Sequence, residues 1–243
     1  MPAELREIRI YPVKALDPIV VHAARVVTNG ALEHDREWAI ADAQGRFLNG
    51  KRTRAIHRLQ GFDADLLASG TTEAEQRLSQ FFDEPVTLVR NTEGGFPDDT
   101  DSPGPTLVSR ASIETVAGWF GWDTENTRRR FRANLEIDGV PAFWEDRLYG
   151  GSLRIGDVLL EAVNPCQRCV VPSRDPASGE ERARFQREFA ELRKAHLPSW
   201  ADPARFNHYY RFAVNTRIPR SEWGKSIRIF SPCTVPPFPP GNA

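Results

Sequence analysis

The chain has 243 residues, of which 40% are hydrophobic, enough apolar material for one large domain or two small ones. Its 32 Lys and Arg residues nearly balance 33 Asp and Glu residues, so no overall charge attracts nucleic acid or an anionic membrane surface. The apolar runs are all far shorter than the roughly 20 residues of a membrane helix, which leaves a small-molecule substrate or a protein as the expected partner.

The N-terminus and the cysteines indicate a compartment. Residues 1–7 lead directly into a strand-like segment, without the basic and then apolar leader of a secreted protein. Three cysteines, two of them in one Cys-x-x-Cys, do not make the disulfide framework of small secreted domains. We therefore expect reduced thiols and a cytoplasmic location.

The first part of the chain is rich in short strand patterns. Residues 5–11 alternate apolar and charged side chains until Pro12 interrupts them. Further segments rich in β-branched or aromatic residues, with turn signals between them, cover residues 22–27, 37–42, 58–66 and 85–89. This spacing predicts a β-barrel or a β-sandwich.

One helix and one long loop interrupt this series. Thr71 or Thr72 can cap a helix over residues 73–82, which is expected to cover an open end of the barrel. Residues 91–105 are rich in Gly, Pro, Asp, Ser and Thr and have no periodicity, which predicts a long surface loop. We place a domain boundary in this loop, between residues 98 and 99.

A second β unit follows the loop. Ser109 can cap a helix that runs through residues 118–120. Strands are predicted over residues 132–137, 152–155, 158–163, 209–214 and 227–230, and a charged helix over residues 181–196. A Pro-rich segment covers residues 236–240. The pattern predicts a mainly β chain with peripheral helices.

The segment Asn164-Pro165-Cys166-Gln167-Arg168-Cys169 carries the clearest chemistry. A Cys-x-x-Cys can be a redox dithiol, half of a zinc site, or a turn that presents one thiolate. A structural zinc site needs about four ligands, and only Cys233 and scattered histidines remain. A thioredoxin-like dithiol opens a helix, which Pro165 and Pro172 disfavour. Arg168 beside Cys169 favours the thiolate, the form that binds metals or attacks electrophiles.

Six motifs occur in a fixed order along the chain. They are Ile10-Tyr11-Pro12-Val13-Lys14, Asp35-Arg36-Glu37-Trp38, Gly45-Arg46-Phe47-Leu48, Phe131-Arg132-Ala133-Asn134-Leu135, Leu153-Arg154-Ile155-Gly156-Asp157-Val158, and Pro165-Cys166-Gln167-Arg168-Cys169 followed by Asp175-Pro176-x-x-Gly179. Together they resemble the MOSC proteins, named for the C-terminal domain of molybdenum cofactor sulfurase. The resemblance extends from Ile8 to Val235 and implies a MOSC N-terminal β-barrel-like domain over residues 1–98, packed with a MOSC β-barrel domain over residues 99–243.

The resemblance also implies site residues. In that family the second cysteine of the Cys-x-x-Cys coordinates molybdenum, which carries over to Cys169 as metal ligand and catalytic residue, with Cys166 as a neighbour. The positions that match cofactor-contacting motifs, or lie in the corresponding regions, are Lys14, Arg36, Ser102, Ser109, Arg132, Asn134, Gln167, Arg168 and Asp175. Cations and amides suit a pterin with a terminal phosphate. A helix cap explains Ser109 equally well, and an Asp-Pro turn explains Asp175.

The implied function is that of an oxidoreductase dependent on a molybdenum-molybdopterin cofactor, similar to the amidoxime-reducing members, which remove oxygen from N-hydroxylated small molecules. Electrons would come from a separate donor protein, because the chain has no cysteine cluster for an iron-sulfur centre. A sulfur-carrier or cofactor-handling protein, with Cys169 as persulfide or transfer thiol, is the alternative. A cofactor-binding protein without turnover is a third interpretation, and the sequence does not separate them.

Overall fold

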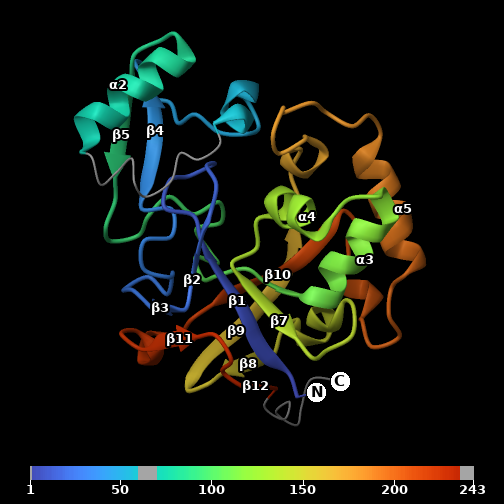
Figure 1. The fold of residues 1–243 in the computed structure, drawn as a ribbon. Coiled ribbons are helices and arrows are strands. Elements are labelled where there is room, and N and C mark those ends of the chain that lie inside the picture. Colours follow the sequence, from blue (N-terminus) through green and yellow to red (C-terminus); the bar gives the residue numbers. More distant parts are fainter. Residues whose placement is uncertain (1, 60–69, 236–243) are drawn as a thin grey trace.

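An eight-stranded sheet forms the centre of the computed structural model, which describes residues 2–59 and 70–235 (Figure 1). In spatial order its strands are β12 (Cys233–Thr234), β8 (Ser152–Ile155), β9 (Val158–Gln167), β10 (Arg211–Arg217), β6 (Leu107–Ser109), β7 (Leu135–Asp138), β1 (Glu4–Ile10) and β2 (Ile19–Val21). Neighbouring strands are antiparallel except β6 and β7, which are parallel. The sheet curls into a half-barrel, so the chain is mainly β with peripheral helices, as predicted.

Two small sheets lie beside the large one. β3 (Ala23–Arg25) pairs with β11 (Ser226–Arg228), and β4 (Trp38–Asp42) pairs with β5 (Val86–Arg90). The helix α2 (Thr71–Phe82) packs beside β4 and β5 at the top of Figure 1. The strands β1 and β2 share one sheet with strands from the second half of the chain. The domain boundary between residues 98 and 99 stays a prediction.

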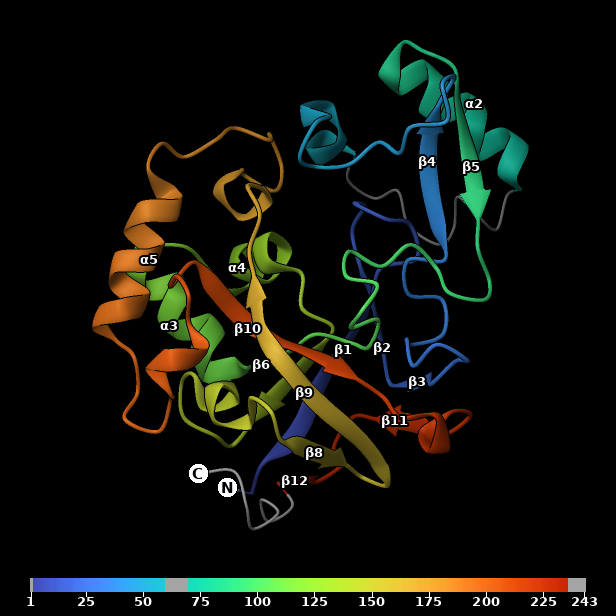
Figure 2. The ribbon, with the colours of Figure 1, turned by 180° about the vertical axis from the view of Figure 1, so that it is seen from behind.

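Three helices gather on the other side of the molecule, as the view from behind shows (Figure 2). They are α3 (Arg110–Phe120), α4 (Thr124–Phe131) and α5 (Phe185–Ala195). Short 3-10 helices are η1 (Arg54–Arg58), η2 (Trp144–Leu148), η3 (Val171–Ser173), η4 (Pro203–Arg205) and η5 (Arg220–Glu222). No helix in the described ranges is both long and apolar enough to cross a membrane.

Aromatic packing fixes α4 against the sheet. The ring of Phe131, at the end of α4, lies 4.5 Å from that of Phe212 on β10 and 5.5 Å from that of Phe189 on α5, measured between centroids. All three side chains are at most 2% exposed. Such pairs stabilise a fold beyond the burial of their area. The residues that follow α4 therefore start from a fixed position.

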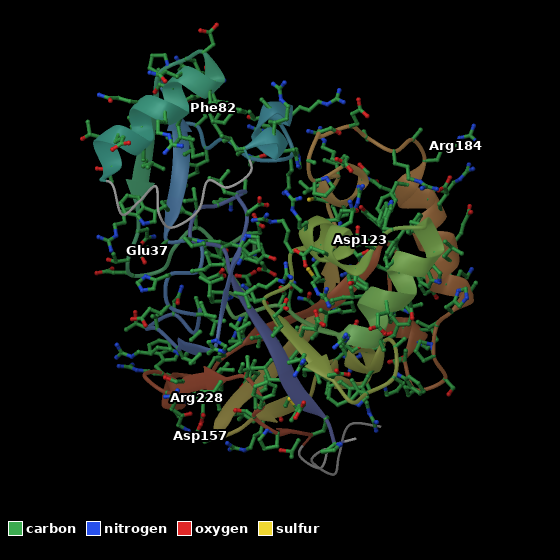
Figure 3. The ribbon with its side chains drawn as sticks, viewed as in Figure 1. Glu37, Phe82, Asp123, Asp157, Arg184 and Arg228 are labelled. Carbon is green, nitrogen blue, oxygen red and sulfur yellow. The ribbon has the colours of Figure 1, made fainter. Side chains whose placement is uncertain are left out.

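The structure corrects several predicted elements. The strand predicted over residues 132–137 begins only at Leu135, because Arg132 is the left-handed C-cap of α4. The helix α4 itself was not predicted, although Asp123 caps it by accepting a hydrogen bond from Asn126 N at 2.6 Å; Figure 3 labels Asp123. The charged helix predicted from residue 181 begins at Phe185.

Other predictions have mixed outcomes. Ser109 caps α3 as expected, whereas the N-cap of α2 is Gly70 in place of Thr71 or Thr72. The strand predicted over residues 58–66 lies largely outside the described residues, and Arg58 ends η1. The Pro-rich segment over residues 236–240 also lies outside them.

Candidate functional site

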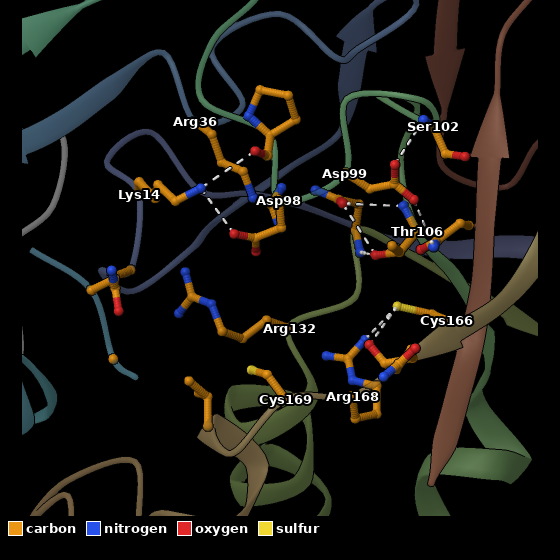
Figure 4. Close-up of a pocket in the computed structure, with 18 of the residues that line it drawn as sticks. Lys14, Arg36, Asp98, Asp99, Ser102, Thr106, Arg132, Cys166, Arg168 and Cys169 are labelled. Carbon is orange, nitrogen blue, oxygen red and sulfur yellow. Dashed lines mark hydrogen bonds and ion pairs between the residues drawn. The ribbon is translucent and has the colours of Figure 1, made fainter. Parts of the chain in front are cut away.

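A cavity of about 930 Å³ lies between segments from the two halves of the chain (Figure 4). One side, which we term the loop wall, consists of the lining residues within 14–17, 31–36 and 94–106. The opposite side, the cysteine wall, consists of the lining residues within 129–134 and 164–171. The volume lies in the range of about 300–1,000 Å³ that is usual for small-molecule sites.

Eight of the ten predicted site residues line this cavity. They are Lys14, Arg36, Ser102, Arg132, Asn134, Gln167, Arg168 and Cys169. Segments far apart in the sequence supply them, so their convergence is a property of the fold. The two remaining residues, Ser109 and Asp175, do not line it.

Ser109 and Asp175 have local structural roles. The Ser109 hydroxyl is fully buried and accepts a hydrogen bond from Ser112 N at 3.1 Å, which caps α3. The Asp175 carboxylate accepts hydrogen bonds from Ala177 N and Ser178 N at 3.0 and 2.9 Å. Burial would raise the Asp175 pKa, but these backbone donors and the charge of Arg130 lower it. The cap and turn explanations therefore account for both residues.

The strand β9 positions the two cysteines. Cys166 lies on β9 and is 9% exposed, whereas Cys169 follows the end of the strand and is more exposed. Tyr210 fixes the turn between them, since its backbone carbonyl accepts from Arg168 N at 3.2 Å and its hydroxyl donates to Cys169 O at 2.9 Å. Both thiols are free. Cys169 is thus the more accessible thiol, held on a turn tied to β10.

Arg168 contacts the other cysteine than the sequence suggested. Its Nη1 donates to Cys166 Sγ at 2.9 Å (Figure 4). Its Nη2 donates to the Phe131 carbonyl. Adjacency in the sequence had paired Arg168 with Cys169. Arg168 instead joins the cysteine turn to the end of α4, and Cys169 remains without that contact.

Lys14 anchors the loop wall. Its Nζ donates to Phe96 O at 2.8 Å. It also forms an ion pair with Asp98 Oδ1 at 2.9 Å (Figure 4). Partial desolvation at the cavity would raise the Asp98 pKa, but the charges of Lys14 and Arg36 outweigh it and hold the pKa at about 2. Asp98 is therefore ionised near neutral pH and faces the cations that line the cavity.

Two buried polar side chains, one from each wall, differ in their hydrogen bonding. Asn134, 2% exposed, donates to Arg9 O at 2.9 Å and accepts from Thr106 N at 3.2 Å, so its amide mainly joins β1 to the segment before β6. Ser102 is 5% exposed, and its hydroxyl has no hydrogen-bond partner in the protein. Buried polar groups usually have a hydrogen-bond partner, so the Ser102 hydroxyl is available to a ligand in the cavity.

The sequence interpretation missed several lining residues, including Lys51, His57, Asp98, Arg129, Asn164 and Asn215. None of these residues lies in one of the six motifs, although Asn164 directly precedes the cysteine motif. Burial lowers the pKa of His57, with further lowering by nearby arginines, so its ring is neutral near pH 7. The carboxylate-rich composition of the loop over residues 91–105 was the one signal that could have pointed to Asp98.

Clusters of protein side chains that could bind a metal ion are absent from the described residues. Within residues 2–59 and 70–235, no three His, Cys, Asp or Glu side chains are grouped so that they could hold a metal ion. A structural zinc site, which needs about four such ligands, therefore has no candidate in that part of the chain. A thiolate at Cys169 can still serve as a single protein ligand to a metal held by other groups.

Two family models match the chain. The model of the MOSC N-terminal beta barrel domain matches residues 2–85, and the model of the MOSC domain matches residues 105–219. The first match includes Lys14 and Arg36, and the second includes Arg132 and Cys169. The cavity thus lies between residues supplied by both matched regions.

Molybdenum cofactor sulfurases are among the similar proteins. The chain is 27% identical over 216 residues to the one from Drosophila grimshawi, covering 68% of this chain and 27% of that protein. It is 35% identical over 81 residues to the one from Caenorhabditis briggsae, covering 33% and 11%. The chain thus spans at most about a third of the length of these relatives. The solved YUAD protein from Bacillus subtilis is 12% identical, with 96% of this chain and 94% of that chain covered and a TM-score of 0.43.

Proposed function

The chain belongs to the MOSC family, and we propose that its cavity binds a molybdenum-molybdopterin cofactor with Cys169 as the protein ligand to the metal. The observation that carries the proposal is that Cys169 shares one cavity with Lys14, Arg36 and Arg132. Thiolates are ligands for soft metals, and Lys and Arg bind phosphate. One cavity therefore offers partners for both ends of such a cofactor.

The residues present fit this group in three respects. The cavity has the volume of a cofactor site. Its loop wall carries the cations Lys14 and Arg36, which suit a phosphate. Ser102 offers a buried hydroxyl that lacks a partner in the protein. These features support the assignment of Lys14, Arg36, Ser102, Arg132 and Cys169 to cofactor contact.

We further propose that the protein reduces N-hydroxylated small molecules with electrons from a separate donor protein. When bound, the cofactor would supply the redox centre that accepts oxygen. The protein's own residues would bind and orient the cofactor. Arg168 and Tyr210 hold the turn that presents Cys169, and Lys14, Arg36 and Arg132 neutralise the anionic part of the ligand.

A second candidate function is sulfur transfer or cofactor handling through Cys169. It is favoured by the relatives, which are molybdenum cofactor sulfurases, and by the greater exposure of Cys169 than of Cys166. An accessible thiolate can attack the outer sulfur of a donor's persulfide, with the donor's thiolate as the leaving group, and then carry that sulfur as its own persulfide. In this function the cavity would bind the cofactor as a substrate.

Metal analysis of cysteine variants tests the ligand assignment. The full chain is expressed in a host that makes molybdenum cofactor, and bound molybdenum is measured for wild type, Cys169→Ala and Cys166→Ala. Cys169→Ala should lose most of the metal because it lacks the ligand, whereas Cys166→Ala should retain it. Loss in the Cys166 variant with retention in the Cys169 variant would contradict the assignment.

Turnover separates the two functions. The loaded wild type is mixed with an N-hydroxylated base and an artificial electron donor, and the reduced base is quantified. Formation of the reduced base that Cys169→Ala abolishes supports the reductase. Absence of reduction, together with cyanide-releasable sulfur that depends on Cys169, supports the carrier.

A further inference from the structure

One buried aromatic ring contacts two of the arginines that line the cavity. Tyr11 directly follows β1 and has no exposed surface. The guanidinium carbon of Arg36 lies 5.0 Å from its ring centroid, and that of Arg132 lies 4.2 Å away. Both distances are within the range of about 6 Å for cation–π contacts. Both arginines line the cavity, whereas Tyr11 does not, so the ring lies behind the wall.

Hydrogen bonds hold Tyr11 next to both arginines. Its backbone N–H donates to Asp35 Oδ1 at 2.9 Å, and its carbonyl accepts from Arg36 N at 2.7 Å. Its hydroxyl donates to the carbonyl of Ala133, the residue after Arg132, at 3.3 Å. The ring is thus tied to the chain beside each arginine, and it joins two segments that are about a hundred residues apart.

Both arginines have an uncommon backbone conformation. Arg36 has a φ of 54° and Arg132 a φ of 55°, the left-handed region that residues other than glycine rarely adopt. Such residues persist only where the surrounding structure fixes them, and they are frequent at ligand sites. For Arg132 the cause is the C-cap of α4, and for Arg36 it is the turn closed onto Tyr11.

The arrangement brings two like charges together. Burial lowers the pKa of Arg132, and the nearby charge of Arg36 lowers it further. Arg36 is compensated by its ion pair with Asp35 and by the charge of Asp98. Arg132 Nη2 donates to the neutral carbonyl of Leu16 at 2.7 Å, and the charges of Asp17 and Asp98 favour its cationic form only through space. The electron-rich face of an aromatic ring offsets part of such repulsion. An anion placed between the guanidinium groups would offset the rest.

From this geometry we infer that Tyr11 is a positioning residue that holds Arg36 and Arg132 together as a clamp for a phosphate group. The inference rests on the proposed function, since the phosphate would be that of the bound cofactor. It assigns a ligand-binding consequence to a residue that does not touch the ligand. A plain core role predicts only lower stability when the ring is removed.

Phosphate binding by ring variants tests the inference. The full chain is purified from a host that does not make the cofactor, and inorganic phosphate is titrated calorimetrically at low ionic strength. Tyr11→Leu should bind phosphate about tenfold more weakly, because both cation–π contacts are lost. Tyr11→Phe retains the ring and should stay within about twofold of wild type. Should Tyr11→Leu fail to fold, Tyr11→Met replaces it, since methionine fills irregular space without a ring face.

A matched control separates positioning from stability. Phe143→Leu also removes a buried ring, but from the N-cap of η2 and away from the cavity. Its thermal midpoint should fall as that of Tyr11→Leu does, while its phosphate affinity stays at the wild-type value. Phosphate affinity in Tyr11→Leu equal to that of Phe143→Leu would overturn the inference. Absence of phosphate binding in the wild type, with no cofactor retained by the loaded protein, would overturn the proposed function itself.

Discussion

The two walls of the cavity hold their side chains in different ways. The cysteine wall rests on β9 and on α4, which buried aromatic rings pack against the sheet. The loop wall depends on ion pairs and carbonyl contacts, such as those of Lys14 with Phe96 and Asp98. A metal ligand needs a fixed position, whereas groups that neutralise charge act over longer distances. In the proposed function, the wall held by aromatic packing supplies the thiol together with Arg132, and the wall held by ion pairs supplies Lys14 and Arg36.

Removing an aromatic ring that supports the cysteine wall should cause the largest loss of stability. Phe131→Ala deletes a side chain that is 1% exposed and should lower the free energy of unfolding by about 3–5 kcal/mol, because it leaves a cavity beneath α4. Urea denaturation measures the change. Phe81→Ala, at a position 38% exposed, is the control and should cost about 1 kcal/mol or less. Equal losses in both variants would show that the wall does not depend on this packing.

The second-largest effect is expected from a buried carboxyl near α3, which should make the free energy of unfolding depend on pH. Burial, and then the charge of Asp146, raises the pKa of Glu145 to about 7, and the side chain is 1% exposed. The pKa of Glu145 is higher in the folded than in the unfolded protein. The contribution of its protonated carboxyl to the free energy of unfolding is therefore fully present below about pH 4.5 and is lost as the pH rises through about 7. The loss should reach about 3 kcal/mol at most.

Denaturation curves between pH 5 and pH 8 check this expectation. Glu145→Gln keeps the shape of the side chain and removes the titration, so its stability should decline less than that of wild type over this range. Parallel declines for both proteins would rule out Glu145 as the source. Because Glu145 Oε2 accepts from Ser109 N, the test also reports on the cap of α3.

The smallest effect is expected from the loop wall. Asp98→Asn removes a carboxylate that competes for Lys14, so inorganic phosphate should bind about two- to fivefold more tightly. The side chain of Asp98 is 69% exposed, and solvent screening keeps the effect small. Asp157→Asn, an exposed position outside the cavity, makes the same change in charge and should leave affinity unchanged. Weaker binding in Asp98→Asn would reverse the assigned role of this carboxylate.

Local patterns were sufficient to predict much of the fold. Alternating side chains identified β1, and a short segment of β-branched or aromatic character between turn signals identified β4. The hydroxyl of Ser109 identified the start of α3. The helix α4 was missed because its sequence contains three consecutive arginines and little apolar surface. Its stability comes from the local cap at Asp123 and from the burial of Phe131, and only the burial depends on tertiary structure.

The candidate site was predictable where motifs carried it and not elsewhere. Lys14, Arg36 and Arg132 lie in motifs, and all three line the cavity. The contact of Arg168 with Cys166 depends on the direction in which the chain leaves β9, which sequence adjacency does not encode. Asp98 contacts Lys14 across a large separation in the sequence, and no motif encodes this ion pair.

The pairing of β3 with β11 bears on how such proteins can be engineered. These strands join residues 23–25 to residues 226–228, and Leu5 N donates to Ser231 O at 3.0 Å nearby. The later segment therefore pairs directly with the earlier one. In a chimera that exchanges only residues 2–85, the new β3 would have to pair with the original β11, and the new β1 with the original β7. Grafting the whole described body is the simpler way to transplant the cavity.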